Sequence, residues 1–117
     1  MTPLQFAVLT YNQDNCLEVL NELLSRNPDL NATSVKQNQT VLILACFLRE
    51  KESLKVLELL LKHSDNMKDD NLKIDPNLQD VRGNTALHYA VLSSKLDVFV
   101  FLLNSFNASS NIMNNRG

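Results

Sequence analysis

The apolar residues of this chain recur in three eight-residue segments that share one pattern. Positions one, three, four, seven and eight of each segment are apolar, which is the spacing of one buried face of an α-helix. The segments are 17–24 (LEVLNELL), 54–61 (LKVLELLL) and 96–103 (LDVFVFLL). Because three separate segments agree, the pattern predicts three helices of one kind and is stronger evidence than any single motif.

A second pattern precedes each of these segments. Thr2, Thr40 and Thr85 are each followed by apolar and small residues at helical spacing, with an alanine five positions after each threonine. Threonine is a favourable helix N-cap. Pro3 suits a first helical position, because the N–H that proline lacks would be unpaired there. The chain is therefore predicted to contain three helix pairs, each with a short helix followed by a second helix.

Turn sequences precede and follow the third helix pair. Residues 80–83 (DVRG) predict a turn in which Gly83 is able to take a positive φ. We expect Ser94 and Asp97 to form an S-x-x-D pattern that begins the second helix. Residues 114–117 (NNRG) repeat the 80–83 turn. A unit of this size cannot bury its own apolar face, so the units are expected to stack.

Residues 80–90 (DVRGNTALHYA) resemble the D-x-x-G-x-T-P-L-H-x-A signature of the ankyrin repeat, with Ala86 where proline is usual. The resemblance implies an all-α solenoid of helix-turn-helix units with β-turn or hairpin fingers. We expect one domain over residues 1–117, with repeats at about 1–34, 35–79 and 80–113 and the start of a further turn at 114–117. Apolar residues near the C-terminal end, Val100, Phe101 and Phe106, favour an excised piece of a longer array or closure by self-association.

The spacing between the threonines is irregular. The intervals are 38 and 45 residues, whereas the ankyrin period is about 33. We place the extra residues in the inter-helix segments 11–15 and 49–52, before Thr40, and in 63–74 (HSDNMKDDNLKI). The last segment is polar and lacks an apolar period, so we predict an inserted surface loop outside the core.

The composition narrows the class of protein. A formal net charge of −2 and an apolar content of 44% over 117 residues are typical of one modest soluble domain. This balance gives no indication of a nucleic-acid partner. The longest apolar run, 41–48, is too short to span a membrane, and no signal peptide is indicated at the N-terminus.

The cysteines and asparagines carry little further chemistry. Cys16 and Cys46 lack metal-ligand spacing and form no disulfide framework, so the expected location is intracellular, in the cytoplasm or nucleus. We interpret Cys46 as a packing residue, and Cys16 has no basic neighbour that would make its thiol reactive. The N-x-S/T sequences at Asn31, Asn38 and Asn107 are interpreted as chance in an asparagine-rich chain.

Catalysis and metal binding have little support. His88 is the histidine of the T-x-L-H pattern, and the resemblance implies a hydrogen-bonding role around the turn. His63 lies near Asp65, Asp69 and Asp70, which we interpret as a solvated polar loop rather than a weak metal site. No convergent set of acid, base and nucleophile is present. We therefore predict no enzymatic activity, no cofactor and no metal.

The ankyrin resemblance implies a protein-binding surface made of turn tips and of the exposed side of the first helices. By position, the tips are Lys36, Gln37, Gln39, Val81, Arg82, Asn84, Asn115 and Arg116, and the first-helix positions are Leu9, Thr10, Phe47, Leu48, Leu92 and Ser93. Leu9, Phe47 and Leu92 fall in one column, and three large apolar groups together would suit a binding hot spot. The alternative is that lengthened inter-helix loops bury them.

Together these features predict a protein–protein interaction module, a scaffold whose partner is another protein rather than nucleic acid or membrane. The RGNT-x-LH run at 82–88 is also similar to the inhibitor-of-NF-κB group, which implies an inhibitor of a transcription factor of that type. A structural or regulatory segment of a larger enzyme, channel or pathogen effector is the alternative. Self-association through the exposed ends is a further expectation, and the sequence leaves all of these open.

Overall fold

The computed structural model describes residues 2–11 and 16–115. Its helices are α1 (Pro3–Leu9), α2 (Cys16–Leu24), α3 (Val41–Ala45), α4 (Glu50–Asp65), α5 (Ala86–Leu92) and α6 (Leu96–Ser105), with a 3-10 helix, η1 (Asp70–Leu72), after α4. Over the described ranges there is no strand, so the prediction of an all-α fold is confirmed. Residues 12–15 of the insertion predicted at 11–15 lie outside the described residues, as do Arg116 and Gly117.

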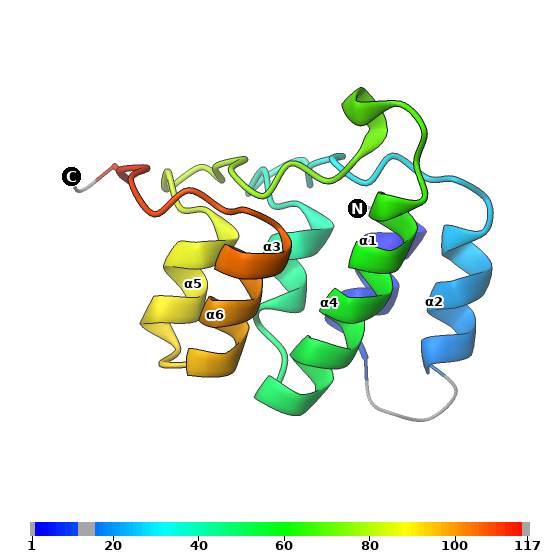
Figure 1. The fold of residues 1–117 in the computed structure, drawn as a ribbon, viewed down its shortest axis with the longest axis horizontal. Coiled ribbons are helices and arrows are strands. Elements are labelled where there is room, and N and C mark those ends of the chain that lie inside the picture. The colour runs from blue at the N-terminus through cyan, green and yellow to red at the C-terminus, as the bar shows by residue number, and fades with distance from the viewer. Residues whose placement is uncertain (1, 12–15, 116–117) are drawn as a thin grey trace.

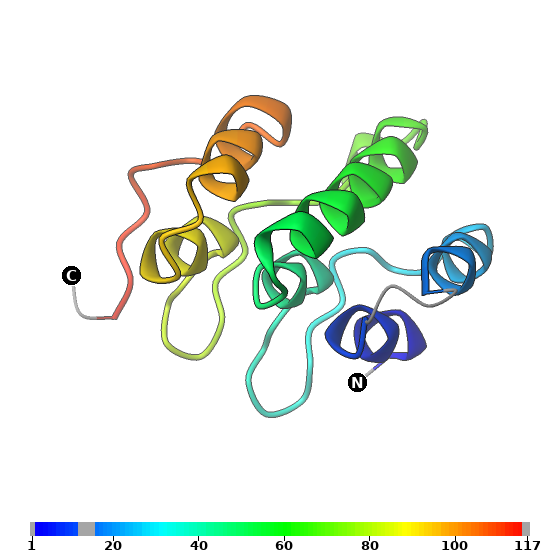
Figure 2. The same cartoon turned by 90° about the horizontal axis from the view of Figure 1, so that it is seen from below.

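The helices form two rows (Figures 1 and 2). One row, which we call the inner row, contains α1, α3 and α5; the outer row contains α2, α4 and α6, and each outer helix packs against an inner one. The loops that join successive pairs project past the inner row, on the side away from the outer row (Figure 2). We call the turns at 34–39 and 80–84, and the segment 113–115 beside them, the fingers.

The predicted threonine caps are present on all three inner helices. The hydroxyl oxygens of Thr2, Thr40 and Thr85 accept hydrogen bonds from the backbone N–H groups of Gln5, Ile43 and His88 at 3.1, 3.3 and 3.4 Å. Gln5 Oε1 and His88 Nδ1 in turn accept from the N–H of Thr2 and Thr85. These reciprocal bonds pair donors that a helix N-terminus would otherwise leave unpaired.

The core lies between the two rows. The shared apolar columns of the outer helices supply much of it, as the eight-residue pattern predicts. The apolar outer-row side chains exposed by 1% or less are Leu20, Leu24, Val56, Leu57, Leu60, Val98 and Leu102. They face inner-row side chains that are equally buried, so the pairs are held together mainly by apolar burial.

A repeated hydrogen bond connects neighbouring fingers. The N–H of Val81 donates to the carbonyl of Gln37, and the N–H of Asn115 donates to the carbonyl of Arg82, both at 3.0 Å. Gly83 has the predicted positive φ, 77°, and a Cβ there would lie 2.5 Å from Asn115 Oδ1. Glycine is therefore required at this position both by the backbone and by the next finger.

The predicted start of α6 is wrong. Ser94 has a φ of 54°, and α6 begins at Leu96 after Lys95. The N–H of Lys95 donates to the carbonyl of Ala90, and the N–H of Ser94 donates to that of Val91, each at 3.0 Å. Ser94 therefore closes the C-terminus of α5 in the manner of a Schellman motif rather than opening the next helix.

The extra residues of the second pair are also placed differently from the prediction. Residues 50–52 belong to α4, which begins at Glu50, so they lengthen a helix instead of a loop. At its other end α4 runs to Asp65. Ser64 is buried, and its Oγ accepts a hydrogen bond of 2.9 Å from the N–H of Ile74, which is 9% exposed. The prediction that all of 63–74 lies outside the core is therefore wrong at both ends.

The middle of this insertion does project from the body of the protein (Figure 1). Residues 68–72 are all exposed and include η1. We expect that replacing 68–72 with two glycines changes the free energy of unfolding by less than about 1 kcal/mol, because loop closure depends weakly on loop length. The control Ile74→Ala should cost about 2 kcal/mol or more. Urea denaturation followed by circular dichroism measures both, and loss of cooperative unfolding in the replacement would show that the segment packs.

Candidate binding surface

Leu9, Phe47 and Leu92 lie at or just after the C-terminal ends of the inner helices. Each stands seven positions after its capping threonine, so the repeated geometry sets them in one column. Their exposed fractions are 42%, 40% and 71%. The ring of Phe47 also meets that of Tyr89 edge to face, with 5.0 Å between centroids and 86° between planes. All three side chains are therefore accessible to solvent.

The residues that follow this column differ in their exposure. Thr10 and Ser93 are exposed, and the hydroxyl of Thr10 donates a 2.8 Å hydrogen bond to the carbonyl of Phe6. Leu48 is half-buried and packs against the core. The accessible part of the inner row is therefore the apolar column with small hydroxyl side chains beside it.

In the first two fingers, four of the predicted residues are exposed to solvent. Lys36, Gln37, Val81 and Arg82 are all exposed. Val35 is 89% exposed and adds an apolar side chain to the first tip, which the sequence reasoning missed. The signal was available, because Val35 occupies the place in its turn that Val81 occupies in the next. We define the inner surface as the column Leu9, Phe47 and Leu92 together with the tips Lys36, Val81 and Arg82.

Other predicted tip residues are occupied within the protein. Asn84 is only 6% exposed, and its Oδ1 accepts a 2.8 Å hydrogen bond from Asn114 Nδ2. The adjacent finger covers it, so its assignment as a surface contact is corrected. Gln39 is half-buried, and Asn115 donates from Nδ2 to the carbonyl of Val81 at 2.9 Å. The bonds of Asn114 and Asn115 connect the third finger to the second, although Asn115 itself remains exposed. Arg116 lies outside the described residues.

A buried carboxylate fixes the second finger on the inner row. Asp80 is 7% exposed, and its Oδ1 accepts from the backbone N–H of Arg82 at 2.9 Å and of Asn84 at 3.0 Å. The hydroxyl of Tyr89 donates to Asp80 Oδ2. Burial, and then this hydrogen bond, raises the pKa of Tyr89. The tip residue Arg82 therefore projects from a turn whose backbone is held in place.

Lys95 joins the third helix pair to the second. Its ammonium donates to the carbonyl of Cys46 at 2.5 Å and also to the carbonyl of Leu48. A cation here satisfies carbonyls at the C-terminal end of α3 and complements the helix dipole. Cys46 is fully buried, and burial raises the pKa of its thiol to about 12, against the opposing effect of Lys95. The thiol is therefore protonated at neutral pH and is unsuited to act as a nucleophile.

The two histidines lie apart from any set of convergent functional groups. Because His88 Nδ1 accepts the N–H of Thr85 at 2.9 Å, its other ring nitrogen carries the proton and the ring serves the helix cap. His63 lies half-buried on α4. Within residues 2–11 and 16–115, no three His, Cys, Asp or Glu side chains are grouped to hold a metal ion. None of the described helices combines the length and the apolar character needed to cross a membrane.

A family model described as ankyrin repeats, in three copies, matches residues 4–114. The chain belongs to the ankyrin-repeat family. It is 33% identical over 93 residues to the neurogenic locus Notch protein of Drosophila melanogaster, and 49% identical over 43 residues to the putative ankyrin repeat protein L92 of Acanthamoeba polyphaga mimivirus. These matches cover 79% and 37% of this chain but only 3% and 10% of the two relatives.

A solved structure has the same ankyrin fold. It is a chain in the crystal structure of the yeast ribosomal protein Rps3 in complex with its chaperone Yar1, with a TM-score of 0.74. The similarity covers 97% of this chain and 77% of that chain at 24% sequence identity. At this identity the likeness shows the fold alone. These comparisons support the ankyrin family, and they do not show the narrower resemblance to the inhibitor-of-NF-κB group.

The two ends of the ankyrin stack expose side chains whose equivalents are buried in other repeats. Val8, Cys46 and Val91 occupy equivalent positions on the inner helices, six residues after the capping threonines. Val8 and Cys46 are 0% exposed, whereas Val91 in the third repeat is 59% exposed. Val19, Val56 and Val98 occupy equivalent positions on the outer helices. Val19 in the first repeat is 51% exposed, whereas Val56 and Val98 are 0% exposed. A cavity of about 260 Å³ lies at the C-terminal end, beside Val91 and Phe99. We call these surfaces the end faces.

Proposed function

We propose that this ankyrin domain is a protein–protein interaction module that binds a partner protein through the inner surface, in the cytoplasm or nucleus. The observation that carries the proposal is the exposed column of Leu9, Phe47 and Leu92, at 42%, 40% and 71%. Large apolar side chains gathered on one face of a protein mark interaction sites more often than isolated ones do. Central aromatic and aliphatic anchors are also the side chains that dominate binding energy at interfaces.

Two further features support a binding role over a catalytic one. Of the side chains near the inner surface that could act as an acid, a base or a nucleophile, Asp80 and Tyr89 bind each other, His88 caps α5, and Cys46 is buried and protonated. The similar yeast structure is a complex between a ribosomal protein and its chaperone. A chain of this fold therefore occurs in a protein complex, and we include the absence of enzymatic activity in the proposal.

The proposal is tested with variants matched for exposure. Leu9→Ser and Phe47→Ser change the inner surface, whereas Val100→Ser changes α6, where Val100 is 43% exposed. Partners captured by the immobilised protein are identified by mass spectrometry, and their affinities are then measured by calorimetry. The first two variants should each weaken binding about tenfold or more, equivalent to about 1.4 kcal/mol, while Val100→Ser should leave it unchanged. A transcription factor of the NF-κB type is one identity that the capture can return.

The contrary outcome is also defined. Phe47 contacts Tyr89, so Phe47→Ser should lose only the modest stability of one aromatic pair, about 0.5–1.5 kcal/mol. If instead its melting temperature falls steeply and affinity changes only as far as folding does, Phe47 serves packing. If Val100→Ser loses as much affinity as Leu9→Ser and Phe47→Ser do, the inner surface is not the specific binding site.

The end faces favour a second candidate, a segment of a longer ankyrin array within a larger protein such as an enzyme, channel or effector. Val91 is exposed, whereas its equivalents Val8 and Cys46 are buried. This difference is expected of a repeat that packs against a further repeat following it in a longer array. Appending a fourth ankyrin repeat should raise the melting temperature, and Val91→Asp should remove that gain. Concentration-dependent dimerisation of the unextended chain that Val91→Asp abolishes would instead support self-association through the ends.

A further inference from the structure

The inner row carries no side chain of aspartate, glutamate, lysine or arginine. Residues 2–11, 40–48 and 85–94, which contain α1, α3 and α5 with their caps, have none of these residues. The fingers beside them add two exposed cations, Lys36 and Arg82. The carboxylate in the same region, Asp80, is 7% exposed and already accepts hydrogen bonds from its own turn and from Tyr89.

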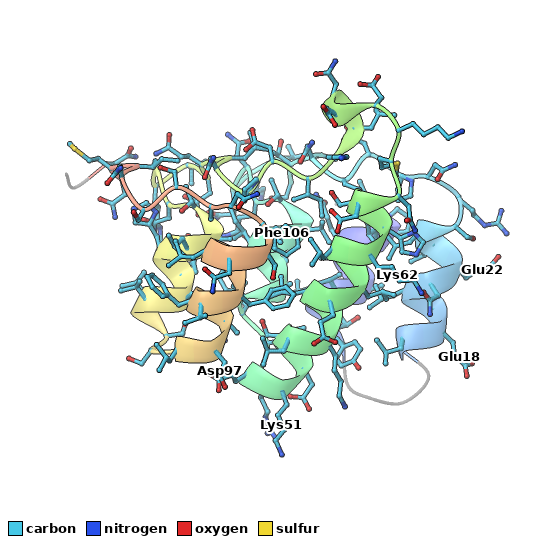
Figure 3. All side chains as sticks on the ribbon, in the orientation of Figure 1. Glu18, Glu22, Lys51, Lys62, Asp97 and Phe106 are labelled. Atoms are coloured by element: carbon cyan, nitrogen blue, oxygen red, sulfur yellow. The ribbon has the colours of Figure 1, made fainter. Side chains whose placement is uncertain are left out.

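The exposed carboxylates of the described chain lie elsewhere. Glu18, Glu22 and Asp97, labelled in Figure 3, project from the outer helices α2 and α6. Others lie on α4, in the insertion that follows it, and at Asp29 and Asp75 in the segments that lead to the fingers. The chain as a whole has a formal net charge of −2, so the charge of the inner surface is opposite in sign to that of the whole protein.

Within the described ranges the side chains of Lys36 and Arg82 form no ion pair with a carboxylate. Two ion pairs within the described ranges, Arg26 with Glu22 and Lys73 with Asp70, lie away from the fingers. A guanidinium group binds carboxylates through two parallel hydrogen bonds and an ammonium group attracts them as a point charge. Lys36 and Arg82 are therefore available to carboxylates from another molecule.

The spacing of the apolar column is close to the spacing of two turns of an α-helix, and the two cations lie on adjacent fingers beside it. The fingers that carry Lys36 and Arg82 are adjacent, because the N–H of Val81 donates to the carbonyl of Gln37 at 3.0 Å. Neighbouring helices pack about 8–10 Å apart, so apolar groups that meet successive members of the column recur at about that interval. Two turns of an α-helix, from i to i+7, advance about 10.5 Å.

We infer that the inner surface binds an acidic amphipathic helix of the partner protein, with apolar side chains on the column and carboxylates at the finger tips. This inference rests on the proposed function and adds the chemistry of the partner. Opposite charge at the edge of an apolar interface raises the association rate and selects against basic segments. The interaction is between exposed charges, so it weakens as salt is added.

Three labelled peptides of about 20 residues, long enough for a stable helix, test the inference by fluorescence anisotropy. All carry leucine at i, i+7 and i+14, and they differ only in having glutamate, glutamine or lysine at the same flanking positions. The glutamate peptide should bind about tenfold or more tightly than the lysine peptide, with glutamine between them. The preference should shrink as the salt concentration rises.

Charge-reversal variants connect this preference to the named residues. Lys36→Glu combined with Arg82→Glu should reverse the order of the peptides, whereas Lys51→Glu combined with Lys62→Glu should not, because both of these lysines lie exposed on α4 (Figure 3). Circular dichroism melts check that both double variants fold.

The outcomes separate the inference from the proposed function. Equal affinities for all three peptides, lost in Phe47→Ser, would overturn the acidic partner and leave the binding surface in place. Binding that Phe47→Ser does not change would contradict both. No binding of any peptide would overturn the acidic helix alone, because the capture experiment tests the proposed function separately. A charge preference that survives in Lys36→Glu combined with Arg82→Glu would overturn the assignment to the finger tips.

Discussion

Replacing Leu57 with alanine should lower the free energy of unfolding by about 2–5 kcal/mol. Leu57 lies on α4 in the middle helix pair and is 0% exposed. Because α4 packs against α2, α3 and α6, the cavity left by the substitution lies where the repeats meet. Urea denaturation measures the loss through the midpoint of a single transition.

Leu72 provides the matched control for this prediction. It is a leucine on η1 that is 57% exposed, so Leu72→Ala should stay within about 0.5 kcal/mol of the unsubstituted protein. If Leu57→Ala falls within the same range, the three pairs do not share a cooperative core. Two separate transitions in Leu57→Ala would lead to the same conclusion.

Removing the carboxylate of Asp80 should have the second large effect. In Asp80→Ala the backbone N–H groups of Arg82 and Asn84 and the hydroxyl of Tyr89 all lose their acceptor. Hydrogen bonds to a charged group contribute about 1.5–3 kcal/mol each, and unpaired buried donors add a cost. We expect a loss of about 3 kcal/mol or more in urea denaturation, with loosening of the second finger.

Two comparison variants make the Asp80 prediction specific. Asp80→Asn keeps an oxygen that can accept from the backbone and should retain most of the stability. Asp29 forms the same kind of turn bond, from its Oδ1 to the N–H of Asn31 at 3.0 Å, but it is exposed. Asp29→Ala should therefore cost less than about 1 kcal/mol, and an equal loss in Asp80→Ala would show that the buried carboxylate does not hold the finger.

The raised pKa of Tyr89 gives the pH dependence of the same cluster. The folded state favours the neutral phenol, since burial and the Asp80 bond both oppose its ionisation. This contribution to stability is fully present below the ordinary tyrosine pKa of about 10 and is lost as pH rises through the higher pKa of the folded protein. Tyr89→Phe should therefore reduce the loss of stability above about pH 10.

The helices could be predicted from the sequence because local physics determines them. Thr2, Thr40 and Thr85 cap helices through bonds to residues three positions away, and the apolar columns follow directly from helical periodicity. The ends of the outer helices were harder to place. Ser94 is compatible with a cap or with a closing turn, and the bond from Lys95 to Ala90 that decides between them forms only in three dimensions.

Contacts between repeats could not be predicted from the sequence, because they join residues that are far apart along the chain. Asn31 Nδ2 donates to the carbonyl of Lys73, and Asn31 Oδ1 accepts from the N–H of Asp75, which fixes the end of the insertion. The ammonium of Lys95 reaches the carbonyl of Cys46. The position of Asn84 in its turn predicts an exposed tip residue, but the next finger covers it in the folded protein. The accessible column could be predicted because it repeats at one helical position.

The central claim, that the inner surface is the binding site, is tested most directly by nuclear magnetic resonance. The isotopically labelled chain is titrated with the glutamate peptide and its backbone amide signals are followed. Binding should shift the signals of Lys36, Phe47, Arg82 and Leu92 and leave the outer helices α2 and α4 unchanged. Shifts concentrated on α2 and α4, with the inner row unaffected, would contradict the account.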